Sequence, residues 1–492
     1  MSMSALTRRK LCICAAASWA AGVSACASGA RPAPDLRFIY NRSAQYHRPD
    51  RNPIVVIPGL LGSRLRNPTN GAIIWGAFDG AAADPSTPNG ARALAAPLAL
   101  DVEAGAAPGL ADADGVLDRV RVRLAGVPFE LAQYAEILAT LGAGGYRDES
   151  LGLAGVDYGG DHFTCFQFPY DWRLDNAANA AALKTFLDAK RIYVSAQYAE
   201  RFGLDVAPSS IRFDVVAHSM GALLLRYFMR YGATPLPEDR APEVNWGGAN
   251  YFERAVLVAP PNAGSLRTLL YLVEGRDFGR PLLPFYPPAI LGTYASLYQL
   301  LPRPRHAPVV WDNPAHEPIG NVFDPVIWRR YEWGLANPAQ DSVRRALFPA
   351  IAGEANRLSV AYELQTNLLR RARRFTAALD VAAGPTPGVE AMLVAGDALD
   401  TPRTLALNDA SGRLSVLESG PGDGAVLRAS ALLDERDGDR WTPALQSPLR
   451  FNTTLLLHGD HLGITRSMSF SDNVLYWLLE APRRQGGANA WL

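Results

Sequence analysis

The fold is decided by one stretch of the chain, Ile211-Arg212-Phe213-Asp214-Val215-Val216-Ala217-His218-Ser219-Met220-Gly221-Ala222-Leu223-Leu224-Leu225-Arg226-Tyr227-Phe228. Its first part, Phe213 to Ala217, is a short apolar run rich in β-branched residues, which predicts a buried strand. From Gly221 onward, apolar residues recur at helical spacing and predict a helix. One serine, Ser219, lies at the junction of the two elements.

This junction has the features of a nucleophile turn. A strand that reverses into a helix within about four residues is strained, and small residues two positions before and after the serine avoid clashes. Ala217 and Gly221 occupy these positions. The usual pattern, G-x-S-x-G, has glycine in place of Ala217, but alanine is the next smallest side chain, so we expect the turn to form. The start of the following helix favours an anion. We therefore predict that Ser219 is a nucleophile for acyl transfer and that Met220 supplies an oxyanion N–H; the alternative is a surface or capping serine.

A second buried strand precedes a candidate partner for this turn. Residues Pro53 to Ile57 form a continuous apolar run, as in a parallel strand covered on both faces. The run ends in Pro58-Gly59-Leu60, and open α/β sheets bind ligands at the carboxyl ends of their strands. Leu60 is therefore the candidate for the second oxyanion N–H. The alternative is a tight turn without a catalytic part.

Length and charge bound the class of protein. The chain has 492 residues, with 48 Lys and Arg against 48 Asp and Glu, so its formal net charge is zero. A neutral chain without a basic tract lacks the electrostatic footprint of a nucleic-acid-binding protein, and no nucleic-acid partner is expected.

The amino terminus predicts export. Arg8, Arg9 and Lys10 precede a short apolar run, Leu11 to Ala25, which is below the ~20 residues needed to cross a bilayer. The run closes in Val23-Ser24-Ala25-Cys26, similar to a bacterial lipobox, in which the cysteine is lipidated and becomes the first residue. We expect a signal peptide at 1–25, lipidation at Cys26 and a membrane-anchored lipoprotein of the periplasm or outer membrane. Ordinary cleavage near the same position is the alternative.

Composition divides the rest of the chain. We expect a tether at 26–50, the first part of the core at 51–264, a cap at 265–349, the second part of the core at 350–482 and a flexible tail at 483–492. The segment 265–349, called the cap segment below, is rich in Leu, Pro and aromatic residues. Such an insertion is typical of a lid that shelters an acyl chain. A structural subdomain with an aromatic core is the alternative. Helices are predicted at Phe129 to Leu141 and at Asn176 to Phe202.

An activated serine needs a base, and in α/β-hydrolases the acid and then the histidine follow the nucleophile along the chain. His461 lies in the turn beyond a strand ending at Leu457, so it is preferred as the base, with His458 in reserve. These two histidines and Asp460 could instead bind a metal, but no further ligand cluster is present, and we expect no metal and no cofactor.

The acid has two candidates. Asp397 closely follows a predicted strand, Met392 to Ala395, as the general plan requires. Asp423 lies between Gly422 and Gly424, where flanking glycines permit an unusual backbone. The spacing alone does not decide between the two carboxylates.

Several motifs in order resemble the lecithin:cholesterol acyltransferase-like family of α/β-hydrolases, over about residues 53 to 480. They are Ile57-Pro58-Gly59-Leu60-Leu61-Gly62-Ser63, Pro169-Tyr170-Asp171-Trp172-Arg173, Ala217-His218-Ser219-Met220-Gly221, the 296–302 segment and Gly422-Asp423-Gly424-Ala425-Val426. The resemblance implies an α/β-hydrolase fold with a mostly parallel sheet, Asp423 as the acid, His461 as the base, an oxyanion residue at Leu60 and a lid over a lipid site. Ala425 replaces the family's usual threonine, and the cysteines that staple the lid in animal relatives have no counterpart.

The expected function is therefore two-step acyl transfer from a lipid ester. The resemblance implies a phospholipid donor, and we expect contact with a membrane surface through the lid and the lipid anchor at Cys26. Water as acceptor would make the protein a lipase or phospholipase, and an alcohol would make it an O-acyltransferase; the sequence does not decide. The alternatives are a soluble-ester hydrolase or thioesterase, and a non-catalytic lipid-binding lipoprotein.

Overall fold

The computed structural model describes residues 41–78, 83–97, 111–117, 119–124, 127–132, 134–159, 162–240, 242–277, 284–436 and 446–483. The expected signal peptide (1–25), the lipidation site Cys26, most of the tether and nearly all of the tail lie outside the described residues. These expectations, and the domain boundaries as a whole, remain predictions.

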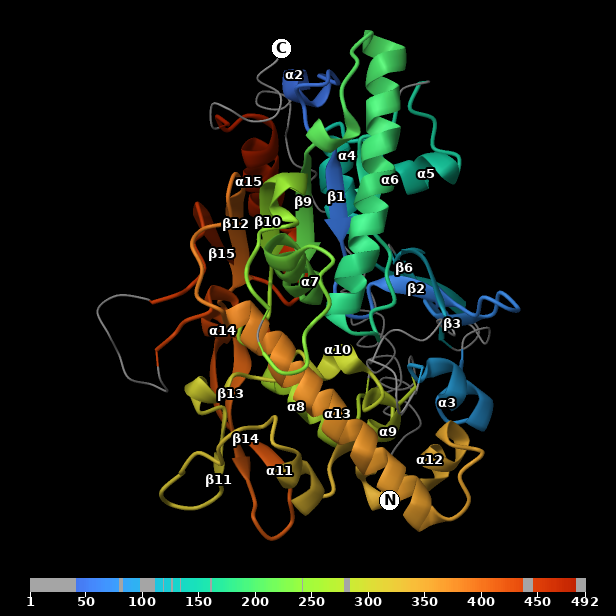
Figure 1. Cartoon of the computed structure of the whole chain (residues 1–492), viewed down its shortest axis with the longest axis vertical. Coiled ribbons are helices and arrows are strands. Elements are labelled where there is room, and N and C mark those ends of the chain that lie inside the picture. Colours follow the sequence, from blue (N-terminus) through green and yellow to red (C-terminus); the bar gives the residue numbers. More distant parts are fainter. Residues whose placement is uncertain are drawn as a thin grey trace, which may run out of the picture.

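A six-stranded sheet forms the centre of the upper half of Figure 1, in the order β15-β12-β10-β9-β1-β8. All neighbouring strands in it are parallel. The strands are β1 (Ile54–Ile57), β8 (Cys165–Gln167), β9 (Phe213–His218), β10 (Phe252–Val258), β12 (Glu390–Gly396) and β15 (Thr453–Leu457). The α/β fold with a mostly parallel sheet, expected from the sequence, is confirmed.

Helices cover both faces of this sheet, so its strands are buried on two sides. Alternate residues of β1 belong to different cores: Val55 and Ile57 pack with residues of α6 (Asn176–Phe202) and α7 (Met220–Tyr231), whereas Ile54 and Val56 pack with residues of α4 (Ala135–Ala143) and α15 (Met468–Leu479). This period of two explains why β1 and β9 read as continuous apolar runs. The helix predicted at Asn176 to Phe202 has these same bounds in the structure.

The other prediction of a helix, Phe129 to Leu141, is partly wrong. Residues Val127–Ala132 form strand β7, which pairs antiparallel with β6 (Arg119–Leu124), and the helix α4 begins only at Ala135. Strand pairing is a tertiary interaction that overrides a local helical pattern. Two small sheets lie on this side, with the orders β4-β6-β7 and β3-β2-β5; their further strands are β2 (Ser63–Arg66), β3 (Ile73–Trp75), β4 (Ala77–Phe78) and β5 (Asp112–Val116). The short helices are α2 (Asn41–Ala44), α3 (Pro88–Leu94) and α5 (Glu149–Leu153).

The cap segment lies in the lower half of Figure 1. Within the described residues it contains α8 (Leu266–Glu274), α9 (Pro288–Leu291), α10 (Ala295–Tyr298), β11 (Val309–Trp311), α11 (Pro325–Arg330) and α12 (Asp341–Leu347). Its strand β11 pairs with β13 (Leu399–Leu407), which pairs with β14 (Leu414–Gly422). Tyr298 and Trp328 are fully buried, so many of the aromatic residues of this segment serve as core.

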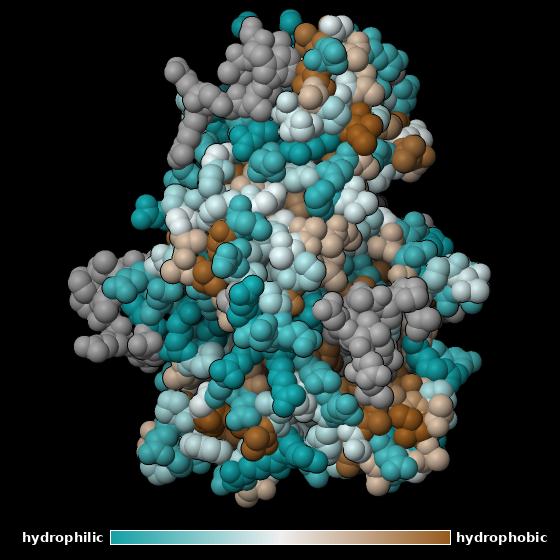
Figure 2. Space-filling model, in the orientation of Figure 1, coloured by the Kyte–Doolittle hydropathy of each residue, from teal (hydrophilic) through white to brown (hydrophobic). Residues whose placement is uncertain are grey.

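The long helix α13 (Glu354–Asp380) crosses the lower half diagonally. Its apolar stripe, including Leu369 and Phe375, is fully buried, whereas Arg370 and Arg373 are exposed. In Figure 2 the surface over the middle of the molecule is accordingly mostly hydrophilic, and apolar atoms form separate patches toward the end that carries α11 and α12. None of the helices described here is both long and apolar enough to cross a membrane.

The loop after β8 is braced by a buried ion pair. Arg173 donates to both carboxylate oxygens of Asp171, at 2.9 and 2.7 Å, and its other nitrogen donates to the carbonyl of Ala95 at 2.9 Å. Trp172 packs within this loop and donates to the carbonyl of Ser63. Arg173 therefore fixes the end of α3 to this loop, and Trp172 fixes the start of β2 to it.

Removing the cation should leave Asp171 buried and uncompensated. We expect Arg173→Met to lower the free energy of unfolding by about 3–5 kcal/mol, measured by urea denaturation. Lys184→Met is the control, because its pair with Asp188 is exposed and its loss should cost within about 0.5 kcal/mol. Equal losses in the two variants would contradict the bracing role.

Candidate active site

Ser219 stands between β9 and α7 in a strained backbone conformation. Its φ is 54° and its ψ is −125°, values that a residue with a side chain rarely adopts. Ser219 lies at the N-terminal end of α7, and its carbonyl accepts the N–H of Ala222 at 3.0 Å. This is the strand–turn–helix context that the sequence predicts, and the turn forms with Ala217 at the position where the usual pattern has glycine.

Two glycines permit the close approach of backbone at this turn. A Cβ on Gly221 would lie 2.3 Å from the carbonyl oxygen of Pro58, and one on Gly59 would lie 2.7 Å from the Cβ of Ser219. Real Cβ atoms do not approach so closely, so both positions require glycine. The segment after β1 is thereby held directly against Ser219.

Three side chains distant in sequence meet at this edge of the sheet. The Oγ of Ser219 lies 2.8 Å from Nε2 of His461, and Nδ1 of His461 lies 2.8 Å from Oδ2 of Asp423. Asp423 is buried, whereas the side chain of His461 is 24% exposed. The structure therefore brings together the three residues that the sequence and the family resemblance indicate.

Hydrogen bonds within the turn around Asp423 fix the orientation of its carboxylate. Its Oδ1 accepts the N–H groups of Ala425 and Val426 at 2.9 and 2.7 Å, which leaves Oδ2 for His461. Burial raises the pKa of Asp423, but the nearby His461 and these hydrogen bonds outweigh burial, and the net pKa is lowered. Gly396, at the end of β12, lies so close that a Cβ there would be 2.6 Å from the Cβ of Asp423. Asp423 is thus ionised, and it lies in close contact with the last residue of β12.

Asp397, the other candidate for the acid, and His458, the reserve candidate for the base, lie elsewhere. Asp397 is 3.7 Å from Arg428 and its side chain is 31% exposed. His458 is exposed at the end of β15. Neither makes a hydrogen bond to Ser219 or His461 among the described residues. No group of three or more described His, Cys, Asp or Glu residues is arranged to hold a metal ion.

The two predicted oxyanion donors flank the serine. Met220 is the first residue of α7, and Leu60 directly follows Gly59, which touches Ser219. Among the described residues, neither backbone N–H donates a hydrogen bond. A helix N-terminus carries unsatisfied N–H groups and a partial positive charge, so an anion next to Ser219 Oγ would be stabilised there.

A buried hydrogen-bond chain connects this segment to the histidine loop. The hydroxyl of Tyr134 accepts the N–H of Gly59 at 2.7 Å and lies 3.0 Å from Nδ1 of His218, and Nε2 of His218 lies 3.0 Å from the carbonyl oxygen of His461. A carbonyl only accepts, so Nε2 carries the proton and Nδ1 accepts from Tyr134. Burial, and next the charge of His461, lower the pKa of His218 to about 3, so the ring stays neutral.

The sequence analysis did not predict this series of hydrogen bonds. His218 adjoins Ser219, but its partner Tyr134 lies within 129–141, the range predicted as one helix. The hydroxyl of Tyr134 is buried at the site because the chain runs from β7 into α4 at this point. Only the paired arrangement of β6 and β7, which local periodicity does not reveal, could have placed it.

A known protein family matches the middle part of the sequence. Residues 130–332 match the model of the family described as lecithin:cholesterol acyltransferase. The match includes Ser219 and ends before Asp423 and His461. No curated protein matches the sequence significantly.

Several solved structures are similar in fold to this chain. A chain of the Tle4–Tli4 complex is 14% identical with a TM-score of 0.49, over 87% of this chain and 98% of that chain. The mature form of Bacillus licheniformis lipase BlEst2 is 12% identical with a TM-score of 0.31, over 88% and 94%. Phospholipase PlaB from Legionella pneumophila is 15% identical with a TM-score of 0.28, over 73% and 57%.

The parallel sheet and the family match both agree with what the sequence motifs predict. The resemblance to the lecithin:cholesterol acyltransferase family is confirmed over residues 130–332, and the chain has an α/β fold with a parallel central sheet.

Proposed function

We propose that the protein is a serine-dependent lipid acyl hydrolase or O-acyltransferase. The family match supports lipid acyl hydrolysis or transfer in general terms. The observation that supports a serine mechanism is that His461 makes 2.8 Å contacts with both Ser219 and Asp423.

In the proposed reaction, Ser219 Oγ attacks the ester carbonyl while Nε2 of His461 removes its proton. Asp423 fixes the imidazole with Nδ1 protonated and stabilises the charged ring. The N–H groups of Leu60 and Met220 hold the oxyanion that forms at the carbonyl oxygen. His461 then returns its proton to the leaving alcohol, and it next activates water or an alcohol that attacks the acyl-enzyme.

The hydrogen-bond chain through His218 supports this geometry. It ties the carbonyl of His461 to the N–H of Gly59, and so joins the base to the segment that carries Leu60. His218 and Tyr134 touch no reacting atom in this scheme, and we regard them as positioning residues. Such residues hold the reacting groups within the narrow range of geometry that transfer requires.

The proposal extends to location. The basic, apolar and lipobox-like segments of 1–26 support export and anchoring through Cys26, which would bring the site to the lipid surface that holds the substrate. Labelling with a radioactive fatty acid, in cells that express the wild type or Cys26→Ala, measures this directly.

Ser219→Ala should abolish ester turnover, with a loss of at least about 10⁴-fold in kcat, and should remove labelling by a serine-directed phosphonate. Ser209→Ala is the control, because Ser209 is exposed and lies away from the site. Assays on phospholipid micelles and on a short soluble ester distinguish a lipid enzyme from a soluble-ester hydrolase or thioesterase. Unchanged labelling in the Ser219 variant would refute the proposed nucleophile, and lipid binding without any labelling of the wild type would favour the non-catalytic alternative.

The two candidate acids allow a matched comparison. Asp423→Asn should lower kcat by about 10³–10⁴-fold, because the amide no longer holds the imidazole in the tautomer that accepts the serine proton. Asp397→Asn changes a partly exposed residue that contacts neither Ser219 nor His461, and it should alter kcat by no more than about twofold. The opposite order of effects would transfer the role of the acid to Asp397.

His218 should make the protein sensitive to acid. Its pKa is about 3 when folded and about 6.5 when unfolded, so the unfolded chain binds the extra proton between these values. Stability should therefore fall as the pH drops below about 6.5, by up to about 1.4 kcal/mol per pH unit from this residue. His218→Gln should be less stable at pH 7 but less sensitive to acid. Urea unfolding of both proteins at pH 7, 6 and 5 should show the difference between them shrinking, and a constant difference would contradict the assignment.

A further inference from the structure

A tight turn carries Leu60, the residue proposed as the second oxyanion donor. The N–H of Gly62 donates to the carbonyl of Gly59 at 3.1 Å, so Leu60 and Leu61 are the two central residues of a β-turn. The φ of Leu61 is 64° and that of Leu60 is negative, which makes this a type II turn. The second central position of such a turn normally holds glycine or asparagine, because a larger side chain is strained there. Leu61 is therefore strained.

The two ends of this turn are fixed by hydrogen bonds of their own. The carbonyl of Pro58 accepts the hydroxyl of Tyr170 at 2.8 Å, and the carbonyl of Gly62 accepts the N–H of Leu117 at 2.8 Å. Both contacts lie outside the two central residues. They hold the ends of the turn in place and do not determine the backbone angles between them.

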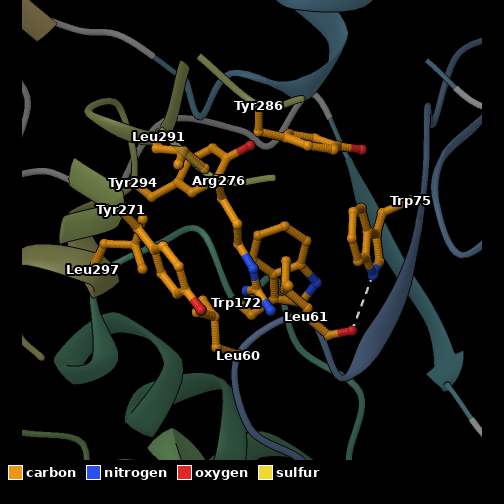
Figure 3. A pocket seen from close by; sticks show the side chains of 10 residues that line it. All are labelled: Leu60, Leu61, Trp75, Trp172, Tyr271, Arg276, Tyr286, Leu291, Tyr294 and Leu297. Atoms are coloured by element: carbon orange, nitrogen blue, oxygen red, sulfur yellow. Dashed lines mark hydrogen bonds between the residues drawn. The ribbon is translucent and has the colours of Figure 1, made fainter. Parts of the chain in front are cut away.

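One hydrogen bond reaches the centre of the turn. Nε1 of Trp75 donates to the carbonyl of Leu61 at 2.9 Å, drawn as the dashed line in Figure 3. Within the part of the chain that the structure describes, no other backbone N–H or carbonyl of Leu60 or Leu61 takes part in a hydrogen bond. The hydrogen bond that opposes the strain at Leu61 therefore comes from Trp75.

The indole of Trp75 is itself held in a fixed direction. Trp75 is the last residue of β3, and its side chain is buried. Its ring packs edge-on against Trp172, with the centroids 5.6 Å apart, and against Tyr286 of the cap segment, with the centroids 5.8 Å apart. Contacts with two rings restrict the rotation of the indole, so its N–H points steadily at the turn (Figure 3).

We propose that Trp75 is a positioning residue, which keeps the N–H of Leu60 in the place of the oxyanion donor by holding the carbonyl of Leu61. The inference rests on the proposed function, in which that N–H stabilises the oxyanion. The strain of a leucine at positive φ and the net contribution of one hydrogen bond are similar in size, so loss of the bond allows the turn to relax. Relaxation rotates the peptide unit between the two leucines. A donor that no longer has a fixed orientation stabilises the transition state less.

A double-mutant cycle tests this inference with the wild type, Trp75→Phe, Leu61→Gly and the variant that carries both substitutions. Trp75→Phe keeps an aromatic ring without the N–H. It should lower kcat for a short soluble ester by about 10–100-fold and change KM by less than about threefold, because an oxyanion donor acts in the transition state. Glycine adopts a positive φ without strain, so in the Leu61→Gly background the same substitution should lower kcat by less than about threefold.

Trp333→Phe is the matched control. Nε1 of Trp333 also donates to a backbone carbonyl at 2.9 Å, that of Gly412, and the side chain is buried in the cap segment away from the turn. Its loss should alter kcat by no more than about twofold. Equal losses of kcat from Trp75→Phe in the two backgrounds would overturn the inference. If Trp75→Phe alone does not fold, a loss of more than about tenfold between Leu61→Gly and the double variant has the same meaning.

A crystal structure of Trp75→Phe separates this inference from the proposed function, because it does not depend on turnover. The φ of Leu61 should change from positive to negative in this variant and stay positive in Trp333→Phe. If the wild type cleaves no ester, the proposed function fails, while the two structures still decide whether Trp75 holds the turn. A positive φ at Leu61 in Trp75→Phe would contradict that role.

Discussion

The parallel pairing of β1 with β9 is the interaction on which the site depends. The register places Ile57 beside Ala217, so the two chains leave the sheet side by side, one toward Gly59 and the other toward Ser219. Such close exits are possible because Gly59 and Gly221 lack a Cβ where another backbone must pass. The strained φ of Ser219 persists because the surrounding sheet and helix determine it from both sides. A slip of this register by one residue would separate the proposed oxyanion segment from Ser219.

Asp423, the proposed acid, lies farther along the chain from β12 than the general plan predicts. The strand β12 ends at Gly396, but the residue that contacts His461 is Asp423, which comes after the hairpin of β13 and β14. The hairpin returns the chain to its starting point, where Leu399 forms a bridge with Asp423. Asp397 lies at the expected distance along the chain but turns toward Arg428. Position after a strand is therefore less informative here than the glycine-flanked turn.

The comparison of sequence and structure shows which information is local. The buried strands β1 and β9, the helix α6 and the serine turn were predictable, because their apolar periodicity and small residues are contained within short windows. The choice of Asp423 needed the family resemblance, since the hairpin that returns it has no signature in spacing. The range 129–141, which includes Tyr134, is predicted as one helix because the pairing of β6 with β7 depends on contacts that periodicity does not encode.

The cap segment is attached to the acid turn itself. Ser265, just before α8, donates its hydroxyl to the carbonyl of Ala425 at 2.6 Å, and Arg267 donates to the carbonyl of Gly424 at 2.7 Å. The same helix carries Tyr271, which lines a pocket together with Leu60 and Trp172. In addition, β11 of the cap segment pairs with β13, the first strand of the hairpin.

A rigid displacement of α8 would therefore pull on the turn that orients Asp423, and through Asp423 on His461. Two hydrogen bonds join the start of this helix to that turn, so Tyr271 and the turn around Asp423 are held in fixed positions relative to each other. The lining of the pocket and the position of the Asp423 carboxylate therefore depend on the same contacts of this segment.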